Sequence, residues 1–219
     1  LFRAWRRHPE KLGRQLSYAR FAYMANFPGR FRPKVLVEYL PRLDKKAGSV
    51  LWDALGMKFT GLSYGRADRL SAENKEFILS LFPREKIYAC LLPQEAVREL
   101  GVPGPGAEAS LGILARLGFR FLHQVDPFDG GPHYGAFTAQ IPVLRATKFL
   151  KYKGLAAGKS KRGPSLLMNV RRGKVRAVVA RYETRGGSLF LDHGIAALLK
   201  LRPGQKVTVT PLGDGHLNV

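Results

Sequence analysis

The sequence is poor in features that would mark a secreted or membrane protein. Its 219 residues include one cysteine, Cys90, so an internal disulfide is excluded and a reducing cytoplasm is expected. No apolar run approaches the roughly 20 residues that cross a bilayer, and residues 1–10 lack the apolar centre of a secretory signal. We therefore expect a cytoplasmic protein without a membrane partner. Cys90 lies in an apolar stretch and is expected to be buried rather than catalytic.

Acidic residues are also scarce, with 16 Asp and Glu against 37 Lys and Arg, which gives a net charge of +21. The excess is uneven: it is +7 in residues 1–40, +3 in residues 41–150 and +11 in residues 151–219. Two basic ends around a nearly neutral middle favour contact with a polyanion, such as CoA phosphates, RNA or an acidic surface. A generally basic composition, without such a ligand, is the simpler alternative.

The spacing of apolar residues and turn signals predicts alternating helices and strands up to residue 125. Expected helices are 9–27, 50–55, 71–82, 93–100 and 107–117, and expected strands are 34–40, 86–92 and 119–125. Such alternation is typical of a layered α/β sheet.

Beyond residue 142 the pattern changes. A Lys- and Gly-rich connection is expected over 148–163, followed by strands 165–170, 175–182 and 206–211 with a short helix 195–199. We therefore predict an α/β domain over 1–145 and a small, basic, β-rich C-terminal subdomain over 146–219.

The stretch from Asp126 to Tyr134, DPFDGGPHY, is a candidate site. Two carboxylates, Asp126 and Asp129, flank an aromatic residue, and Gly-Gly-Pro then forces a sharp change in backbone direction. Carboxylates in this arrangement suit a guanidinium group, which binds two oxygens at once. The alternative is a plain hairpin turn in which glycine supplies a positive φ.

Three stretches resemble the arginine N-succinyltransferases: 59–70 (FTGLSYGRADRL) with 74–78, 81–96 (LFPREKIYACLLPQEA) and 118–134 (GFRFLHQVDPFDGGPHY). This family transfers a succinyl group from succinyl-CoA to the α-amine of arginine in arginine catabolism. The resemblance implies a GNAT-type fold, which is a mixed sheet flanked by helices, in a chain truncated at its amino terminus relative to the family. It also implies an acyl-CoA cosubstrate rather than a permanently bound cofactor or metal, and allows a homo- or hetero-oligomer.

The resemblance also implies roles for residues. It places the arginine substrate near Asp126, Asp129 and Asp68, and the CoA near a set at the start of the chain: Leu1, Phe2, Arg3, Arg6, Lys11, Gly13 and Arg14. In the family, a glycine-rich loop that opens a helix binds the CoA pyrophosphate through backbone N–H groups. At the corresponding residues of this chain, Lys11 replaces the first glycine and Pro9 removes one N–H donor. Backbone contacts are therefore partly replaced by charge.

A second departure from the family pattern concerns the residue that transfers the proton. The family's proposed proton-transfer histidine corresponds here to Gly104, in a turn without a titratable side chain. His133 is the expected replacement, because an imidazole suits deprotonation of an amine; His123 is the rival. Glu38 is a further candidate base or substrate contact, and Tyr134 and Tyr64 are candidate donors to the departing thiolate. The alternative function is an inactive family member that binds RNA or another polyanionic assembly through its basic ends.

Overall fold

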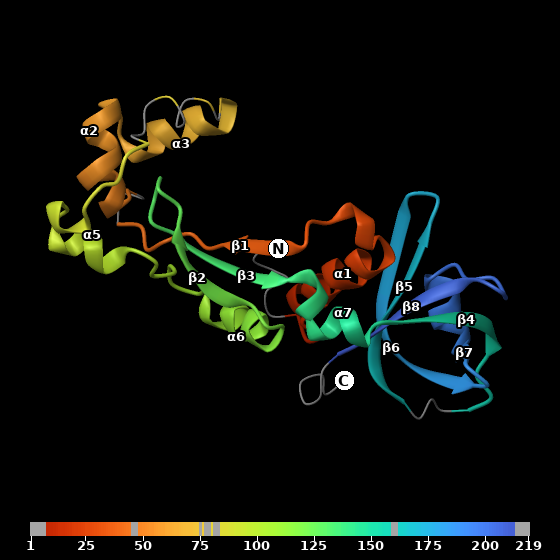
Figure 1. The fold of residues 1–219 in the computed structure, drawn as a ribbon. Coiled ribbons are helices and arrows are strands. Elements are labelled where there is room, and N and C mark those ends of the chain that lie inside the picture. Colours follow the sequence, from red (N-terminus) through yellow and green to blue (C-terminus); the bar gives the residue numbers. More distant parts are fainter. Residues whose placement is uncertain are drawn as a thin grey trace. The chain divides into compact units, whose positions relative to one another are not determined.

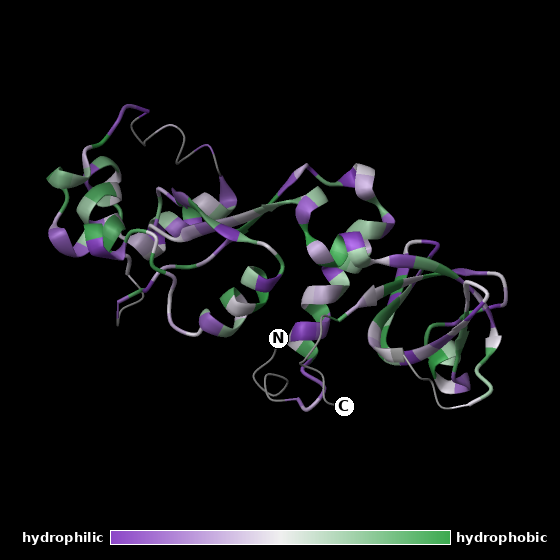
Figure 2. Cartoon of the chain, turned by 60° about the horizontal axis from the view of Figure 1, so that its bottom comes forward, coloured by the Kyte–Doolittle hydropathy of each residue, from purple (hydrophilic) through white to green (hydrophobic). Residues whose placement is uncertain are grey.

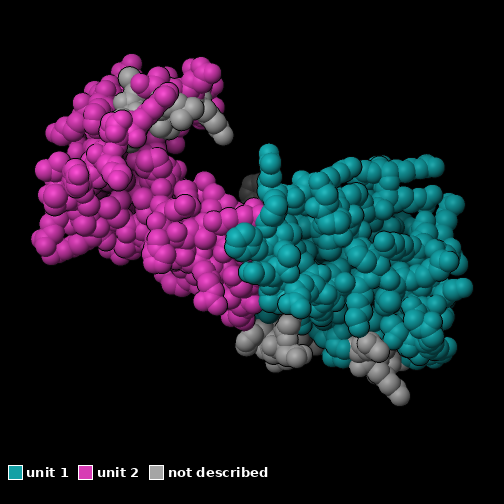
Figure 3. All heavy atoms as spheres, in the orientation of Figure 1, with its two compact units in different colours: residues 1–33, 137–219 teal, residues 34–136 magenta. Residues whose placement is uncertain are grey.

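The computed structural model describes residues 8–44, 48–74, 76, 80, 84–158 and 162–212, with the side chain of Arg162 excepted (Figure 1). The chain forms two compact units (Figure 3). Unit 1 combines residues 1–33 with 137–219, and unit 2 comprises residues 34–136. Hydrophobic residues occur throughout both units (Figure 2). Among the described residues, no helix is both long and apolar enough to cross a membrane.

Unit 2 contains a three-stranded sheet in the order β1-β3-β2, with β1 at Lys34–Glu38, β2 at Arg120–Val125 and β3 at Pro132–Phe137. β2 and β3 pair antiparallel, with Phe121 opposite Tyr134. Along β1, exposed and half-buried residues alternate, as expected for a strand with one covered face. The Tyr39 N–H donates to the Pro132 carbonyl at 3.1 Å, which ties the end of β1 to the start of β3.

Short helices make up the rest of unit 2. They are η3 (Trp52–Gly56), α2 (Met57–Thr60), α3 (Tyr64–Glu73), η4 (Ala89–Leu91), α5 (Gln94–Glu99) and α6 (Glu108–Arg116). Their core is aromatic: the rings of Trp52 and Phe128 lie 4.3 Å apart, and Tyr64 packs against both. The Trp52 Nε1–H donates to the Leu62 carbonyl at 2.8 Å, so the buried indole is satisfied. This core fixes Phe128, at the centre of the 126–131 turn.

Unit 1 is built on a closed barrel in the order β4-β7-β6-β5-β8. Its strands are β4 (Lys148–Leu155), β5 (Arg162–Arg171), β6 (Lys174–Arg185), β7 (Ser188–Leu191) and β8 (Lys206–Pro211), and α8 (His193–Leu198) packs against the same core. The remaining elements are α1 (Leu12–Asn26), η2 (Pro28–Arg30), η5 (Thr138–Gln140) and α7 (Pro142–Ala146). At the end of α1, Asn26 Oδ1 accepts a 2.9 Å hydrogen bond from the Thr208 hydroxyl on β8.

Most predicted elements are confirmed, and the fold is a mixed α/β arrangement with a β-rich carboxyl-terminal part. The expected elements at 9–27, 34–40, 93–100, 107–117, 119–125, 165–170, 175–182, 195–199 and 206–211 correspond to α1, β1, α5, α6, β2, β5, β6, α8 and β8. The division into units differs from the expected domains 1–145 and 146–219, because α1 packs on barrel strands β5 and β8.

Five local predictions are wrong, one of them the burial of Cys90. Residues 86–92 form no strand: the segment lies at the surface, with Tyr88 69% and Leu91 77% exposed, and Cys90 is exposed as well. The helix expected over 50–55 continues to Thr60 through a π turn. The helix expected from Ser71 begins at Tyr64 and reaches Glu73, and several positions up to residue 83 lie outside the described residues. The 148–163 connection contains strand β4, and β7 was not anticipated.

Candidate functional site

The turn at residues 126–131 is held by its own carboxylates. Asp126 Oδ1 accepts the N–H of Phe128 and Asp129 Oδ1 accepts the N–H of Gly131, each at 2.8 Å. Gly130 has a φ of 84°, which favours glycine. A Cβ on Gly131 would lie 2.2 Å from the Tyr39 carbonyl oxygen, so only glycine fits between the turn and the end of β1. The turn geometry expected from the sequence is therefore present, and it places both carboxylates at one end of the sheet.

Asp129 and Tyr64 form a buried pair beneath this turn. The Tyr64 hydroxyl donates to Asp129 Oδ2 at 3.4 Å, and the Ser49 hydroxyl donates to the Asp129 carbonyl at 3.2 Å. Burial raises the pKa of the Asp129 carboxyl; the Gly131 N–H opposes this shift, and the nearby charge of Asp126 adds to it. The pKa of Tyr64 is raised by burial first and then by Asp129. Both carboxylate oxygens of Asp129 thus have donors within the protein.

Glu38, Asp126 and His133 form the second group. One ligand atom from each lies within 4.8 Å of the other two, and Glu38 Oε1 is 3.8 Å from His133 Nε2. The side chain of Glu38 is 61% exposed and that of His133 only 16%. His133 Nε2 is buried and has no hydrogen-bond partner among the described residues. The carboxylate therefore faces solvent while the imidazole lies behind it.

The sheet explains this grouping. Glu38 is the last residue of β1, His133 is the second residue of the neighbouring strand β3, and Asp126 follows the end of β2. An imidazole nitrogen and two carboxylate oxygens can share a proton, bind a cationic group or hold a divalent cation. The expectation that no metal is bound stays a prediction.

The other predicted residues of unit 2 lie apart from this group. The Tyr134 ring contacts Tyr39 and Phe121, with ring centres 5.6 and 5.7 Å away. Because neighbouring residues of a strand point to opposite faces, Tyr134 and His133 face opposite sides of the sheet. Asp68 is exposed on α3 and acts on Asp129 through its charge. His123, the rival histidine, is exposed and has a φ of 55°.

Gly104 leaves no room for a side chain. A Cβ at this position would lie 2.6 Å from the Pro41 carbonyl oxygen, and the Gly104 N–H donates to the Leu40 carbonyl at 2.8 Å. The backbone of residues 40–41 therefore occupies the space where the family resemblance would place its histidine.

Among the residues expected near CoA, those that the structure describes lie in unit 1, at the start of α1. Lys11 precedes the helix with a φ of 50° and is exposed, and Gly13 and Arg14 belong to its first turn, which contains no acidic residue. The Arg14 guanidinium lies 5.8 Å from the centre of the Tyr18 ring. A helix amino terminus with nearby cations suits phosphate groups. Leu1, Phe2, Arg3 and Arg6 lie outside the described residues.

Two supporting residues were not anticipated in these roles. The Ser49 hydroxyl accepts the Trp52 N–H and also donates to the Asp129 carbonyl. Tyr39 shares a 2.6 Å hydrogen bond with Ser110 on α6, and its carbonyl closes over Gly131. Ser49 and Asp129 are 80 residues apart in the sequence, so no local pattern could indicate their contact.

The raised pKa of Asp129 predicts a pH-dependent stability. Folding favours the protonated carboxyl, so this contribution is complete below the ordinary pKa of 3.8 and is lost as the pH rises through the raised value. Asp129→Asn keeps an acceptor for the Gly131 N–H but cannot ionise. Relative to the unmodified protein, the variant should therefore gain unfolding free energy as the pH rises from about 3 to about 7.

Urea unfolding at several pH values measures this difference. Asp53→Asn, which changes an exposed carboxylate of the same unit, is the matched control and should show a nearly flat difference. Intact mass must show that the new Asn-Gly pair has not deamidated. A flat difference for Asp129→Asn would contradict the assigned environment of this carboxyl.

Comparisons with known proteins agree on one family. The model of the arginine N-succinyltransferase beta subunit family matches residues 1–143. The chain is 32% identical over 201 residues to the arginine N-succinyltransferase subunit beta of Pseudomonas aeruginosa, covering 91% of the chain and 59% of that protein. It is 31% identical over 212 residues to an arginine N-succinyltransferase of Salmonella paratyphi B, covering 95% of the chain and 60% of that protein.

A solved structure is also similar, that of the arginine/ornithine succinyltransferase subunit AI from Pseudomonas aeruginosa. It has a TM-score of 0.75 and 31% identity, and the match covers 92% of this chain and 58% of the solved one. The chain thus spans about 60% of the length of these relatives. None of their names refers to a nucleic acid.

Proposed function

The chain belongs to the arginine N-succinyltransferase beta subunit family, and we propose that it transfers a succinyl group from succinyl-CoA to the α-amine of arginine. The observation that carries the proposal is the group of Glu38, Asp126 and His133. It supplies a proton acceptor and negative charge next to each other, and arginine needs both when it accepts the succinyl group.

The chemistry requires a neutral amine. The α-amine nitrogen attacks the thioester carbonyl carbon, the carbon–sulfur bond breaks, and CoA leaves as its thiolate. The proton lost by the amine goes to the pair of Glu38 and His133, and the thiolate takes up a proton from this pair or from water. Because Glu38 is exposed and His133 Nε2 is buried behind it, the carboxylate meets the amine first and the imidazole accepts the proton through it.

Asp126 is assigned to the substrate cation. Its Oδ1 is fixed by the Phe128 N–H, so the carboxylate is oriented before substrate arrives. Asp129 and Tyr64 are proposed to support the turn from below. The raised pKa of Tyr64 makes this hydroxyl a poor proton donor to the thiolate, and Tyr134 faces the opposite side of the sheet.

For CoA, the start of α1 offers backbone N–H groups together with Lys11 and Arg14. These residues fit a pyrophosphate because the first helical turn lacks acidic side chains. We also propose the GNAT-type arrangement for the fold, and an assembly with a further subunit, since one relative is named as subunit beta.

Thiol release from succinyl-CoA, measured with and without arginine, tests the proposed activity. The expected result is arginine-dependent release together with succinylarginine detected by mass. Thiol release that does not depend on arginine or any other amine would overturn the acyltransfer proposal.

Asp126→Asn should raise KM for arginine by about 10- to 100-fold, because a charge-assisted hydrogen bond to the guanidinium is replaced by a neutral one. KM for succinyl-CoA should remain within about twofold, since Asp126 is not assigned to CoA. Steady-state kinetics with each substrate varied in turn measure both values. An unchanged KM for arginine would remove Asp126 from the substrate site.

The polyanion alternative rests on the basic hairpin between β5 and β6. Arg171, Arg172 and Lys174 are all exposed there. A polyanion-binding role predicts that log K for a generic RNA falls steeply with log salt and that neutralising these residues flattens the slope. The acyltransferase proposal predicts weak RNA binding that CoA reduces. A salt titration of RNA binding, with and without CoA, separates the two.

A further inference from the structure

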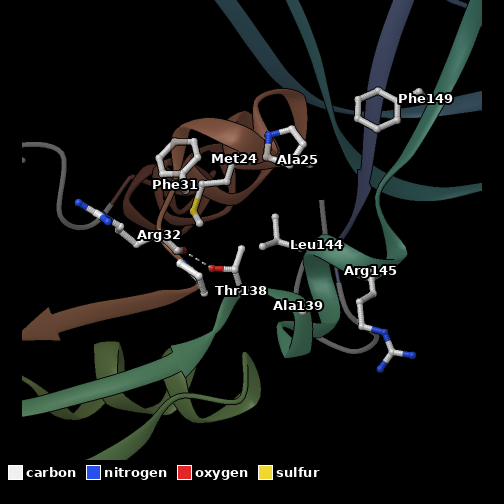
Figure 4. A pocket seen from close by; sticks show the side chains of 11 residues that line it. Met24, Ala25, Phe31, Arg32, Thr138, Ala139, Leu144, Arg145 and Phe149 are labelled. Carbon is white, nitrogen blue, oxygen red and sulfur yellow. Dashed lines mark hydrogen bonds between the residues drawn. The ribbon is translucent and has the colours of Figure 1, made fainter.

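A cavity of about 500 Å³ lies within unit 1 (Figure 4). Its walls come from the end of α1, the segment 28–33, η5, α7 and the start of β4. Its volume is in the range of pockets that bind small molecules. Of the residues assigned to CoA, arginine or proton transfer, none that the structure describes lines it, so the proposed function does not explain the cavity.

The lining is largely apolar. Met24, Phe31, Leu144 and Phe149 face the space from three elements and the segment after α1 (Figure 4). The Thr138 hydroxyl donates to the Arg32 carbonyl at 2.9 Å, so this polar group is already engaged. A ligand rich in amides or hydroxyls would find few partners here, which disfavours the pantetheine arm of CoA.

The charged residues that the structure describes around the cavity are basic. Arg32 and Arg145 are exposed and extend from its edge, and Lys206 lies 4.0 Å from the centre of the Phe149 ring. Among the residues that the structure describes, no acidic one lines the cavity. Apolar walls with cations at the rim match a molecule that has an apolar body and one anionic end.

We propose that this cavity binds a small apolar carboxylate, with its hydrocarbon part among Met24, Phe31, Leu144 and Phe149 and its carboxylate between Arg32 and Arg145. Arginine side chains are long and flexible, so the two guanidinium groups can turn toward a carboxylate at the rim. The site acts independently of succinyl transfer, and its test needs no enzymatic activity.

Titration calorimetry with decanoate and with its neutral amide, decanamide, tests the site. Decanoate should bind in a 1:1 ratio, about fivefold more tightly than decanamide, because each exposed ion pair contributes only modestly. The double variant Arg32→Gln, Arg145→Gln should remove this preference and leave decanamide binding unchanged. The matched double variant Arg171→Gln, Arg202→Gln, which removes two exposed charges elsewhere, should retain the preference.

Ala139→Trp places a large side chain in the cavity and should abolish binding of both probes, whereas Ala146→Trp, at an exposed position outside the lining, should not. Excess CoA should leave decanoate binding unchanged. The site is overturned by absent binding, by equal affinity for the acid and the amide, by binding that survives Ala139→Trp, or by displacement by CoA. The arginine variants keep the proposal testable if Ala139→Trp does not fold, because they change exposed side chains only.

Discussion

His133→Gln is expected to lower kcat for succinyl transfer by about 10²- to 10³-fold, with little change in KM for arginine. The imidazole accepts the proton that the α-amine loses, and glutamine can form hydrogen bonds but cannot accept that proton. Because the His133 side chain is largely buried behind Glu38, the loss should appear in the chemical step rather than in substrate binding. Rapid-mixing and steady-state kinetics distinguish these two effects.

The pH profile adds a readout that a structural role for His133 would not change. The unmodified protein should gain activity with rising pH over the limb on which its general base loses a proton, and His133→Gln should lose that limb. His123→Gln, on the exposed face of β2, is the matched control and should keep both rate and profile. A variant at His133 with full activity, or with low activity and an unchanged pH limb, would assign proton transfer to Glu38 or to water.

The sequence predicts helices and strands well where burial agrees with the periodic spacing of the apolar residues. β8 at Lys206–Pro211 matches its expected range because alternating residues and a preceding turn both mark it. Residues 86–92 fail for the opposite reason: Ile87, Tyr88 and Leu91 are apolar, but no strand in the described part of the chain pairs with them, and they remain exposed. An apolar run alone does not reveal whether a sheet edge is available to it.

The candidate site, too, could be predicted from the sequence only in part. The DPFDGGPHY stretch correctly indicates a tight turn carrying carboxylates, because glycine and aspartate preferences are local. That Glu38 would lie beside His133 depends on which strands are neighbours, and this is decided by the β1-β3-β2 order. Sequence alone also could not show that the oxygens of Asp129 accept bonds from Gly131 and Tyr64, whereas Glu38 stays open to solvent.

Gly131→Ala is expected to destabilise unit 2 by about 3 kcal/mol and to abolish arginine-dependent turnover. The added methyl group would lie 2.2 Å from the Tyr39 carbonyl oxygen and 3.0 Å from Asp129 Oδ1. One of these contacts is with backbone, so relief requires β1 to separate from the turn. Such a separation would break the Tyr39 to Pro132 hydrogen bond and move Glu38 away from His133.

Urea unfolding, monitored by tryptophan fluorescence, measures the loss of stability of unit 2. The protein has two tryptophans, so in a Trp5→Phe background the signal comes from Trp52, which is fully buried in unit 2. The control is Gly112→Ala in α6, where the nearest atom to a new Cβ is the flexible end of Arg116 at 3.8 Å. That change should stabilise the unit by up to about 1 kcal/mol, because alanine is the better helix former. If Gly131→Ala leaves the Trp52 transition and turnover unchanged, the turn does not pack against β1. The proposed function would then lose its structural basis, which is the proximity of Glu38, Asp126 and His133.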